Sequence, residues 1–252
     1  MSWLPDERYE AEFAAETARL SAAVVALAPD DRIPTCPEWT VRDLVGHVGA
    51  GHRWSATMIE TRATVPLVPI PVVPAPQARD EWPGWLAEGA QRLVDAVRDT
   101  GHRTAVWTWQ EDKTAGFWLR RMMHDELIHR YDAEHATGRP AHDVAPDLAA
   151  DGISDFLDTA ATLSRPTAPD WGFRGLSGSG ETLRFETPTG SWFVRRTPDG
   201  ATWTRDDGPA DVVVTGSDWD LLLVLNRRLE PGSVTATGDE ALFTHWWESG
   251  KF

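Results

Sequence analysis

The segment 122–132 (MMHDELIHRYD) contains two histidines and three acidic residues, side chains that can bind a metal ion. Its composition favours a helix, in which residues three and four apart share a face, so His129 lies beside both Asp125 and Glu126. An imidazole and a carboxylate one turn apart can form half of a zinc-type site, which leaves a position open for water or substrate when it is catalytic. The same pattern is also typical of a solvent-exposed helix face with an ion pair, and the sequence leaves open which acid points inward.

A further metal ligand has to come from another part of the chain, and His47 is the best candidate. It lies among small apolar residues, including neighbouring glycines, in a segment that favours a helix. This setting predicts partial burial of the imidazole and leaves room for a ligand or for close approach of another helix. The alternative is a core histidine with a backbone partner. His52 and Arg53, one turn further on, could reach the same opening and bind a cofactor.

The charge of the chain excludes several partners. The 252 residues include 39 acidic and 24 basic side chains, which give a formal net charge of -15. Binding to nucleic acid or to an anionic membrane surface needs clustered positive charge, so we expect neither. The 41% hydrophobic and 25% charged content is typical of a globular protein.

Cysteine content and hydropathy indicate the compartment. Cys36 is the one cysteine, so no intramolecular disulfide can form, which fits a reducing environment. We see neither a signal peptide nor a run of about 18 apolar residues that could cross a membrane. The sequence therefore predicts a cytoplasmic protein.

The order of expected elements indicates two different regions. Helical periodicity covers most of the first 163 residues, and its pattern is typical of a helix bundle. A proline-rich loop at 64–78 interrupts it and is expected to lie against the protein surface. Turn-forming residues then alternate with short strand patterns, which predicts a smaller α+β region. The expected helices are 7–28, 41–62, 82–98, 115–137, 146–163, 217–226 and 238–248, and the expected strands are 182–187, 191–196, 201–205, 211–215 and 233–237.

Two arginines end the apolar helix expected at 217–226. Arg227 and Arg228 could simply be cations placed favourably at a helix C-terminus. The functional interpretation is an anion clamp, in which Arg228 contacts a carboxylate of the substrate or cofactor.

Three segments together resemble the mycothiol-dependent maleylpyruvate isomerase family. They are 36–47 (CPEWTVRDLVGH), 52–54 (HRW) and 121–133 (RMMHDELIHRYDA). The resemblance implies a DinB-like four-helix bundle over residues 1–164 that binds a divalent metal, usually zinc. It also implies a smaller α+β domain resembling sterol-carrier proteins over residues 168–252. The family holds its metal with a histidine on the second helix and a Glu-x-x-x-His pair on a later one.

The family pattern maps onto His47 and His129, but its glutamate position is Asp125 here. Aspartate can bind a metal and is about one methylene shorter, while Glu126 beside it could substitute. We therefore predict an enzyme that uses a divalent metal, zinc or another ion such as nickel, with mycothiol as thiol cosubstrate. It would isomerise a small electrophilic substrate or transfer the thiol to it, as a monomer or homodimer. A metal-dependent hydrolase and a non-catalytic small-molecule-binding protein are the alternatives.

Overall fold

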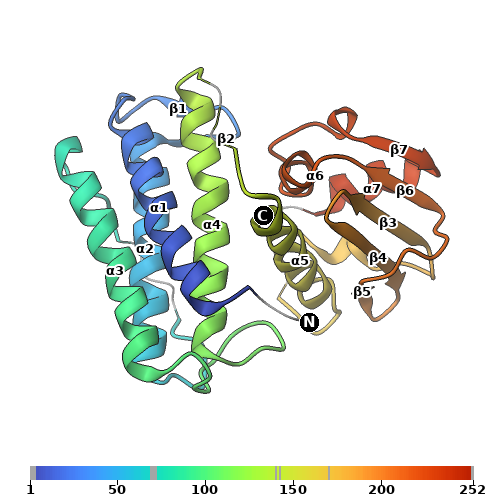
Figure 1. Ribbon diagram of the computed structural model, residues 1–252, viewed down its shortest axis with the longest axis horizontal. Coiled ribbons are helices and arrows are strands. Elements are labelled where there is room, and N and C mark those ends of the chain that lie inside the picture. Colours follow the sequence, from blue (N-terminus) through green and yellow to red (C-terminus); the bar gives the residue numbers. More distant parts are fainter. Residues whose placement is uncertain (1–3, 69–72, 140, 142, 170, 251–252) are drawn as a thin grey trace. The chain divides into compact units, whose positions relative to one another are not determined.

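The chain folds into two units, residues 1–142 and 143–252. The computed structural model describes residues 4–68, 73–139, 141, 143–169 and 171–250 (Figure 1). The first unit is helix-rich and the second combines helices with a sheet, as the sequence predicts. Among the described residues, no helix has both the length and the apolar character needed to cross a membrane.

Four long helices build the first unit. Helix α1 contacts α3 and α4, and α2 contacts the same two helices, so apolar faces from all four meet in one core. Phe13 of α1, Leu44 of α2 and Leu93 of α3 are fully buried there. Each helix lies within about one turn of its predicted bounds, because periodicity and turn residues fix helices well. The helices are α1 (Asp6–Val24), α2 (Val41–Glu60), α3 (Trp82–Thr100) and α4 (Ala115–Ala136), with a 3-10 turn, η1 (Arg79–Glu81), before α3.

Helix α2 begins at a capping box that fixes the position of His47 two turns later. The Asp43 amide donates to Thr40 Oγ1 at 3.2 Å, and the Thr40 amide donates to Asp43 Oδ2 at 2.9 Å. These hydrogen bonds satisfy amides that the first helical turn leaves unpaired. Side-chain and backbone hydrogen bonds from Thr40 lower the pKa of Asp43, so this carboxylate stays ionised at neutral pH.

The segment before α2 is a hairpin, although residues 33–39 belong to none of the helices and strands expected from the sequence and so were expected to form a loop. Strands β1 (Arg32–Ile33) and β2 (Cys36–Thr40) pair antiparallel. The prediction was wrong because β1 is too short to produce an alternating pattern. In addition, Pro34 and Pro37 have no backbone N–H to donate to a strand ladder, so the segment did not look like a pair of strands.

Helices α2 and α3 approach closely at Gly49. A Cβ atom at this position would overlap the indole ring of Trp85. The neighbouring glycines of His47 therefore include one that permits close helix packing.

The proline-rich loop packs on the first unit where the structure describes it. The indole of Trp54 donates to the carbonyl of Leu67 at 2.9 Å, and that of Trp82 donates to the carbonyl of Pro76 at 2.9 Å. Arg42 donates to the same Pro76 carbonyl at 3.0 Å. Residues 69–72 of this loop lie outside the described part of the chain.

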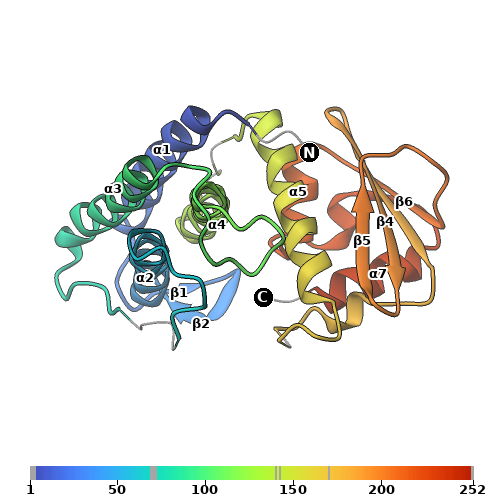
Figure 2. The ribbon, with the colours of Figure 1, turned by 90° about the horizontal axis from the view of Figure 1, so that it is seen from below.

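The second unit is a five-stranded sheet with helices. The strand order is β5-β4-β3-β6-β7, with β3 and β6 parallel and the other pairs antiparallel. Figure 2 shows the helices of this unit on one face of the sheet. The expected elements are present as α5 (Pro146–Leu163), β3 (Thr182–Thr187), β4 (Gly190–Thr197), β5 (Gly200–Thr204), β6 (Val212–Thr215), α6 (Asp218–Leu225), β7 (Thr235–Gly238) and α7 (Glu240–Ser249), with 3-10 turns η2 (Arg174–Leu176) and η3 (Pro231–Ser233).

The boundary between the units lies before α5, whereas the sequence placed it after this helix, at residue 164. Helix α5 contacts α6 and β5. Ser154 of α5 accepts a 2.9 Å hydrogen bond from the indole of Trp192, and Asp158 accepts one of 3.1 Å from Trp203. Periodicity shows that α5 is amphipathic, but it does not show which partner covers the apolar face.

Candidate metal centre

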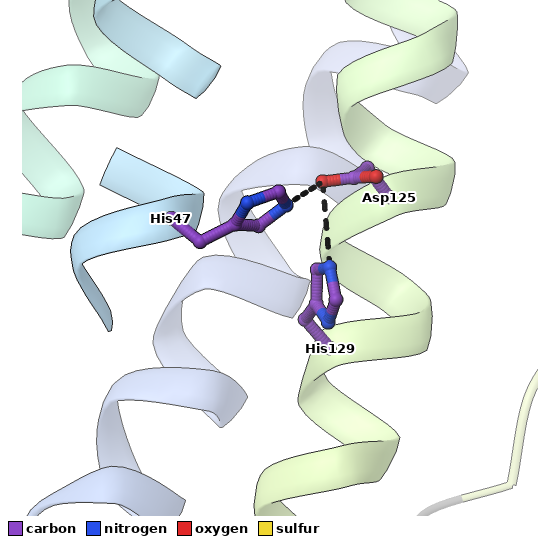
Figure 3. A group of neighbouring side chains, drawn as sticks. All are labelled: His47, Asp125 and His129. Atoms are coloured by element: carbon purple, nitrogen blue, oxygen red, sulfur yellow. Dashed lines mark ion pairs between the residues drawn. The ribbon is translucent and has the colours of Figure 1, made fainter. Parts of the chain in front are cut away.

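Three of the predicted ligands come together in the first unit. His47 projects from α2, and Asp125 and His129 project from α4 (Figure 3). Asp125 Oδ2 lies 3.7 Å from His47 Nε2 and 3.8 Å from His129 Nε2. One ligand atom from each residue lies within 4.8 Å of the other two. The two distant segments therefore form one cluster of two imidazoles and a carboxylate.

The spacing of these atoms fits a shared divalent ion. The two nitrogen–oxygen distances exceed those of a hydrogen bond, so the three groups do not satisfy one another. A tetrahedral ion with bonds of about 2.1 Å keeps its ligand atoms roughly 3.4 Å apart, close to the observed spacing. Two histidines and one carboxylate are a typical catalytic zinc set that leaves a fourth position open.

The environment of Asp125 keeps its carboxylate ionised. Burial would raise the pKa of this carboxyl, but interactions with His129, His47 and Arg121 hold the pKa well below its usual range. Arg121 donates to Oδ1 at 3.0 Å, while Oδ2 faces the two imidazoles. One oxygen is therefore fixed by a cation, and the other faces the point that the ligands share.

Trp39 of β2 forms an aromatic wall beside the cluster. Its ring centroid lies 4.7 Å from that of His47 and 5.6 Å from that of His129. The two imidazole rings meet edge to face at 4.9 Å. The His47 side chain is 45% exposed, more than predicted, whereas the His129 side chain is 8% exposed. The cluster is thus open to solvent on the side of α2.

Asp132 lies directly behind His129. Its Oδ2 lies 2.8 Å from His129 Nδ1, on the side of the ring away from the cluster. Thr35 Oγ1 donates to the other carboxylate oxygen at 2.6 Å, and Cys36 Sγ lies 3.7 Å from Oδ2. Sequence reasoning did not single out Asp132. Its i, i+3 spacing from His129 was a visible signal, but its partners come from a hairpin that was expected to be a loop.

Comparison with known proteins identifies the helical unit. Residues 11–134 match the family model of the mycothiol maleylpyruvate isomerase N-terminal domain. The N-terminal unit of this chain belongs to that family. No curated protein sequence gives a significant match.

The similarity to solved structures extends beyond the residues of this N-terminal domain. The crystal structures of the mycothiol-dependent maleylpyruvate isomerase and of a mutant of it are 19% and 18% identical to the chain. Each alignment covers 93% of both chains with a TM-score of 0.59, which supports a shared two-unit fold. The ubiquinone synthesis protein UbiJ-SCP2 aligns over 43% of this chain with a TM-score of 0.30, too low to test the expected sterol-carrier likeness.

Glu126 and His52 of this domain do not join the cluster of His47, Asp125 and His129. Glu126 Oε2 instead lies 2.5 Å from His52 Nε2, and the two side chains are 0% and 2% exposed. Phe13 of α1 packs edge to face on the His52 ring at 5.0 Å. Successive helix residues point about 100° apart, so Asp125 and Glu126 cannot face the same point. The structure therefore places Asp125 with the histidines, and it puts His52 in the core rather than at a cofactor.

Arg53 also lies apart from the cluster. The Arg53 guanidinium stacks on Trp85 at 4.1 Å from the ring centroid and donates to the carbonyls of Gly49 and Trp85 at 3.1 and 2.8 Å. These contacts hold Arg53 between α2 and α3. Arg228 belongs to the second unit, where it donates to the carbonyl of Asn226 at 2.9 Å. Its contact with a substrate carboxylate stays a prediction.

Proposed function

We propose that the chain is a divalent-metal-dependent enzyme with mycothiol as its thiol cosubstrate. It would isomerise a small electrophilic substrate or transfer the thiol to it. The convergence of His47, Asp125 and His129 carries this proposal, because these ligands come from separate segments and fit one ion. The family of the N-terminal domain supports the choice of thiol. The names of the structural relatives make maleylpyruvate the first electrophile to test.

The ligand set indicates which metal the site would hold and what that metal would do to a bound thiol. Zinc is our first choice, although nickel and other divalent ions accept the same nitrogen and oxygen donors. An ion held here would lower the pKa of a coordinating thiol, so that the thiolate forms at neutral pH and can add to an electrophile. We infer that α1 to α4 form the DinB-like four-helix bundle that holds this ion.

The other residues of the site would bind and orient the reactants. Trp39 supplies an apolar wall beside both imidazoles, which would exclude water from one side of an incoming thiol. Arg121 fixes one oxygen of Asp125, so the carboxylate cannot rotate freely away from the ion. We retain Arg228 as the proposed contact for a substrate carboxylate.

The test is a turnover assay with the zinc-loaded protein. We expect isomerisation of maleylpyruvate with mycothiol and none without it. His129→Ala should lose both zinc and turnover. His135→Ala is the matched control, because this residue lies on the same helix and packs on Tyr131 at 5.7 Å instead of joining the cluster. Thiol-independent hydrolysis would favour the hydrolase. Bound zinc without reaction on any electrophile tested would favour the binding protein.

A further inference from the structure

Asp132 is a buried carboxylate that joins a candidate metal ligand to the hairpin β1–β2. Its side chain is 0% exposed. A carboxylate in such a position needs polar partners, because the loss of hydration is otherwise costly. His129, Thr35 and Cys36 supply these partners, as described above. Two of the three lie in the hairpin, so Asp132 connects α4 with a segment nearly a hundred residues away.

The contact between Asp132 and His129 determines which imidazole nitrogen carries the proton. A carboxylate oxygen 2.8 Å from Nδ1 is a hydrogen-bond acceptor there, which favours the tautomer with the proton on Nδ1. The lone pair of Nε2 then points toward Asp125 and the shared ligand point. A carboxylate behind a metal-binding histidine fixes the tautomer and ring orientation and makes the nitrogen a better ligand.

The hairpin also contacts the ligand on the other helix. Trp39 of β2 packs on His47 of α2 as well as on His129 of α4. Thr35, Cys36 and Trp39 lie within five residues, so one short element contacts both imidazoles, directly or through Asp132.

We propose that Asp132 is a positioning residue of the metal centre and that Thr35 of the hairpin holds it in place. This inference rests on the proposed function, because it concerns the same metal site. Asp132 would not touch substrate or metal, and it would act through His129. Metal affinity and the His129 tautomer should therefore depend on a hairpin that supplies no ligand.

The first test measures the tautomer of His129 in metal-free protein by nitrogen-15 NMR. The wild type should show the proton on Nδ1. In Asp132→Asn the carboxamide can donate to Nδ1, so the population with the proton on Nε2 should increase. A wild-type His129 with its proton on Nε2 would overturn the proposal.

The second test measures zinc affinity by competition with a chromophoric chelator. Asp132→Asn should bind zinc about 10- to 100-fold more weakly. Thr35→Val, which removes one hydrogen bond, should weaken binding by about 2- to 10-fold. In the double variant the Thr35 change should add little, since both changes act through one chain of contacts. Asp155→Asn, at a buried aspartate of the second unit, is the matched control and should leave zinc affinity unchanged.

Zinc affinity of Asp132→Asn within about twofold of the wild type would refute the positioning role. If Asp132→Asn fails to fold, Thr35→Val and the wild-type tautomer still decide the question. A wild-type protein that binds no zinc would refute the proposed function. The tautomer measurement needs no metal and would then still show whether Asp132 orients His129.

Discussion

The paired substitutions Asp125→Asn and Glu126→Gln should separate metal binding from stability. Each exchanges a carboxylate for an amide of the same shape, so neither leaves a cavity. Glu126 and His52 are almost fully buried, and Glu126 Oε2 and His52 Nε2 lie within hydrogen-bond distance of each other. Hydrogen bonds with charged partners contribute about 1.5–3 kcal/mol, so we expect Glu126→Gln to cost about 2 kcal/mol. For a unit of this size the melting temperature should fall by roughly 6 °C.

Asp125→Asn should have the opposite effects, with a small loss of stability and a large loss of zinc affinity. Its side chain is 24% exposed and keeps a polar partner in Arg121, so the cost in stability should stay within about 1 kcal/mol. Removal of one ligand charge should weaken zinc binding by at least about 100-fold, because each ligand of a zinc site contributes roughly 3 kcal/mol. Thermal unfolding of metal-free protein and a chelator competition measure the two effects. The reasoning is wrong if Glu126→Gln loses zinc while Asp125→Asn keeps it.

Three further predictions concern the cap of α2, the packing of α2 on α3, and the metal. The pKa of Asp43 is lowered by Thr40, so its stabilising effect is present above the unfolded pKa of about 4 and is lost as the pH falls through the lowered value. Asp43→Asn should therefore cost about 1 kcal/mol in urea unfolding at pH 7, and a difference that persists at acid pH would contradict this. Gly49→Ala should destabilise the protein by about 1–3 kcal/mol, because the added carbon would overlap the Trp85 ring. Gly84→Ala is the control and should not destabilise it, since no atom lies within 4 Å of the added carbon, and equal thermal unfolding of the two variants would refute the packing argument. Chelation should abolish thiol-dependent turnover and added zinc should restore it, whereas full turnover in metal-free protein would exclude a catalytic ion.

The sequence predicted the helices and the pairing of Asp125 with His129 from local spacing, whereas His47 was proposed from its setting and from the family resemblance. The interval between His129 and Asp125 is one helical turn, and the capping box of Thr40 and Asp43 marks where the helix of His47 begins. Such signals need no knowledge of tertiary contacts.

Spacing could not decide between Asp125 and Glu126, since both share a face with His129. Tertiary packing distinguishes the two acids, because Glu126 contacts His52 in the core and Phe13 packs against the His52 ring. The same limit applies to Asp132, whose partner Thr35 lies in a hairpin too short to leave a strand pattern.

Cobalt titration of metal-free protein, followed by addition of mycothiol, tests whether the cluster holds an ion that binds the thiol. Cobalt substitutes for zinc and reports its ligands through its electronic spectrum. We predict one ion per chain, lost in His47→Ala and in His129→Ala, and a sulfur-to-cobalt charge-transfer band when the thiol is added. Cobalt that binds equally well in both variants, or a spectrum that mycothiol does not change, would contradict a thiol-activating metal centre at His47, Asp125 and His129.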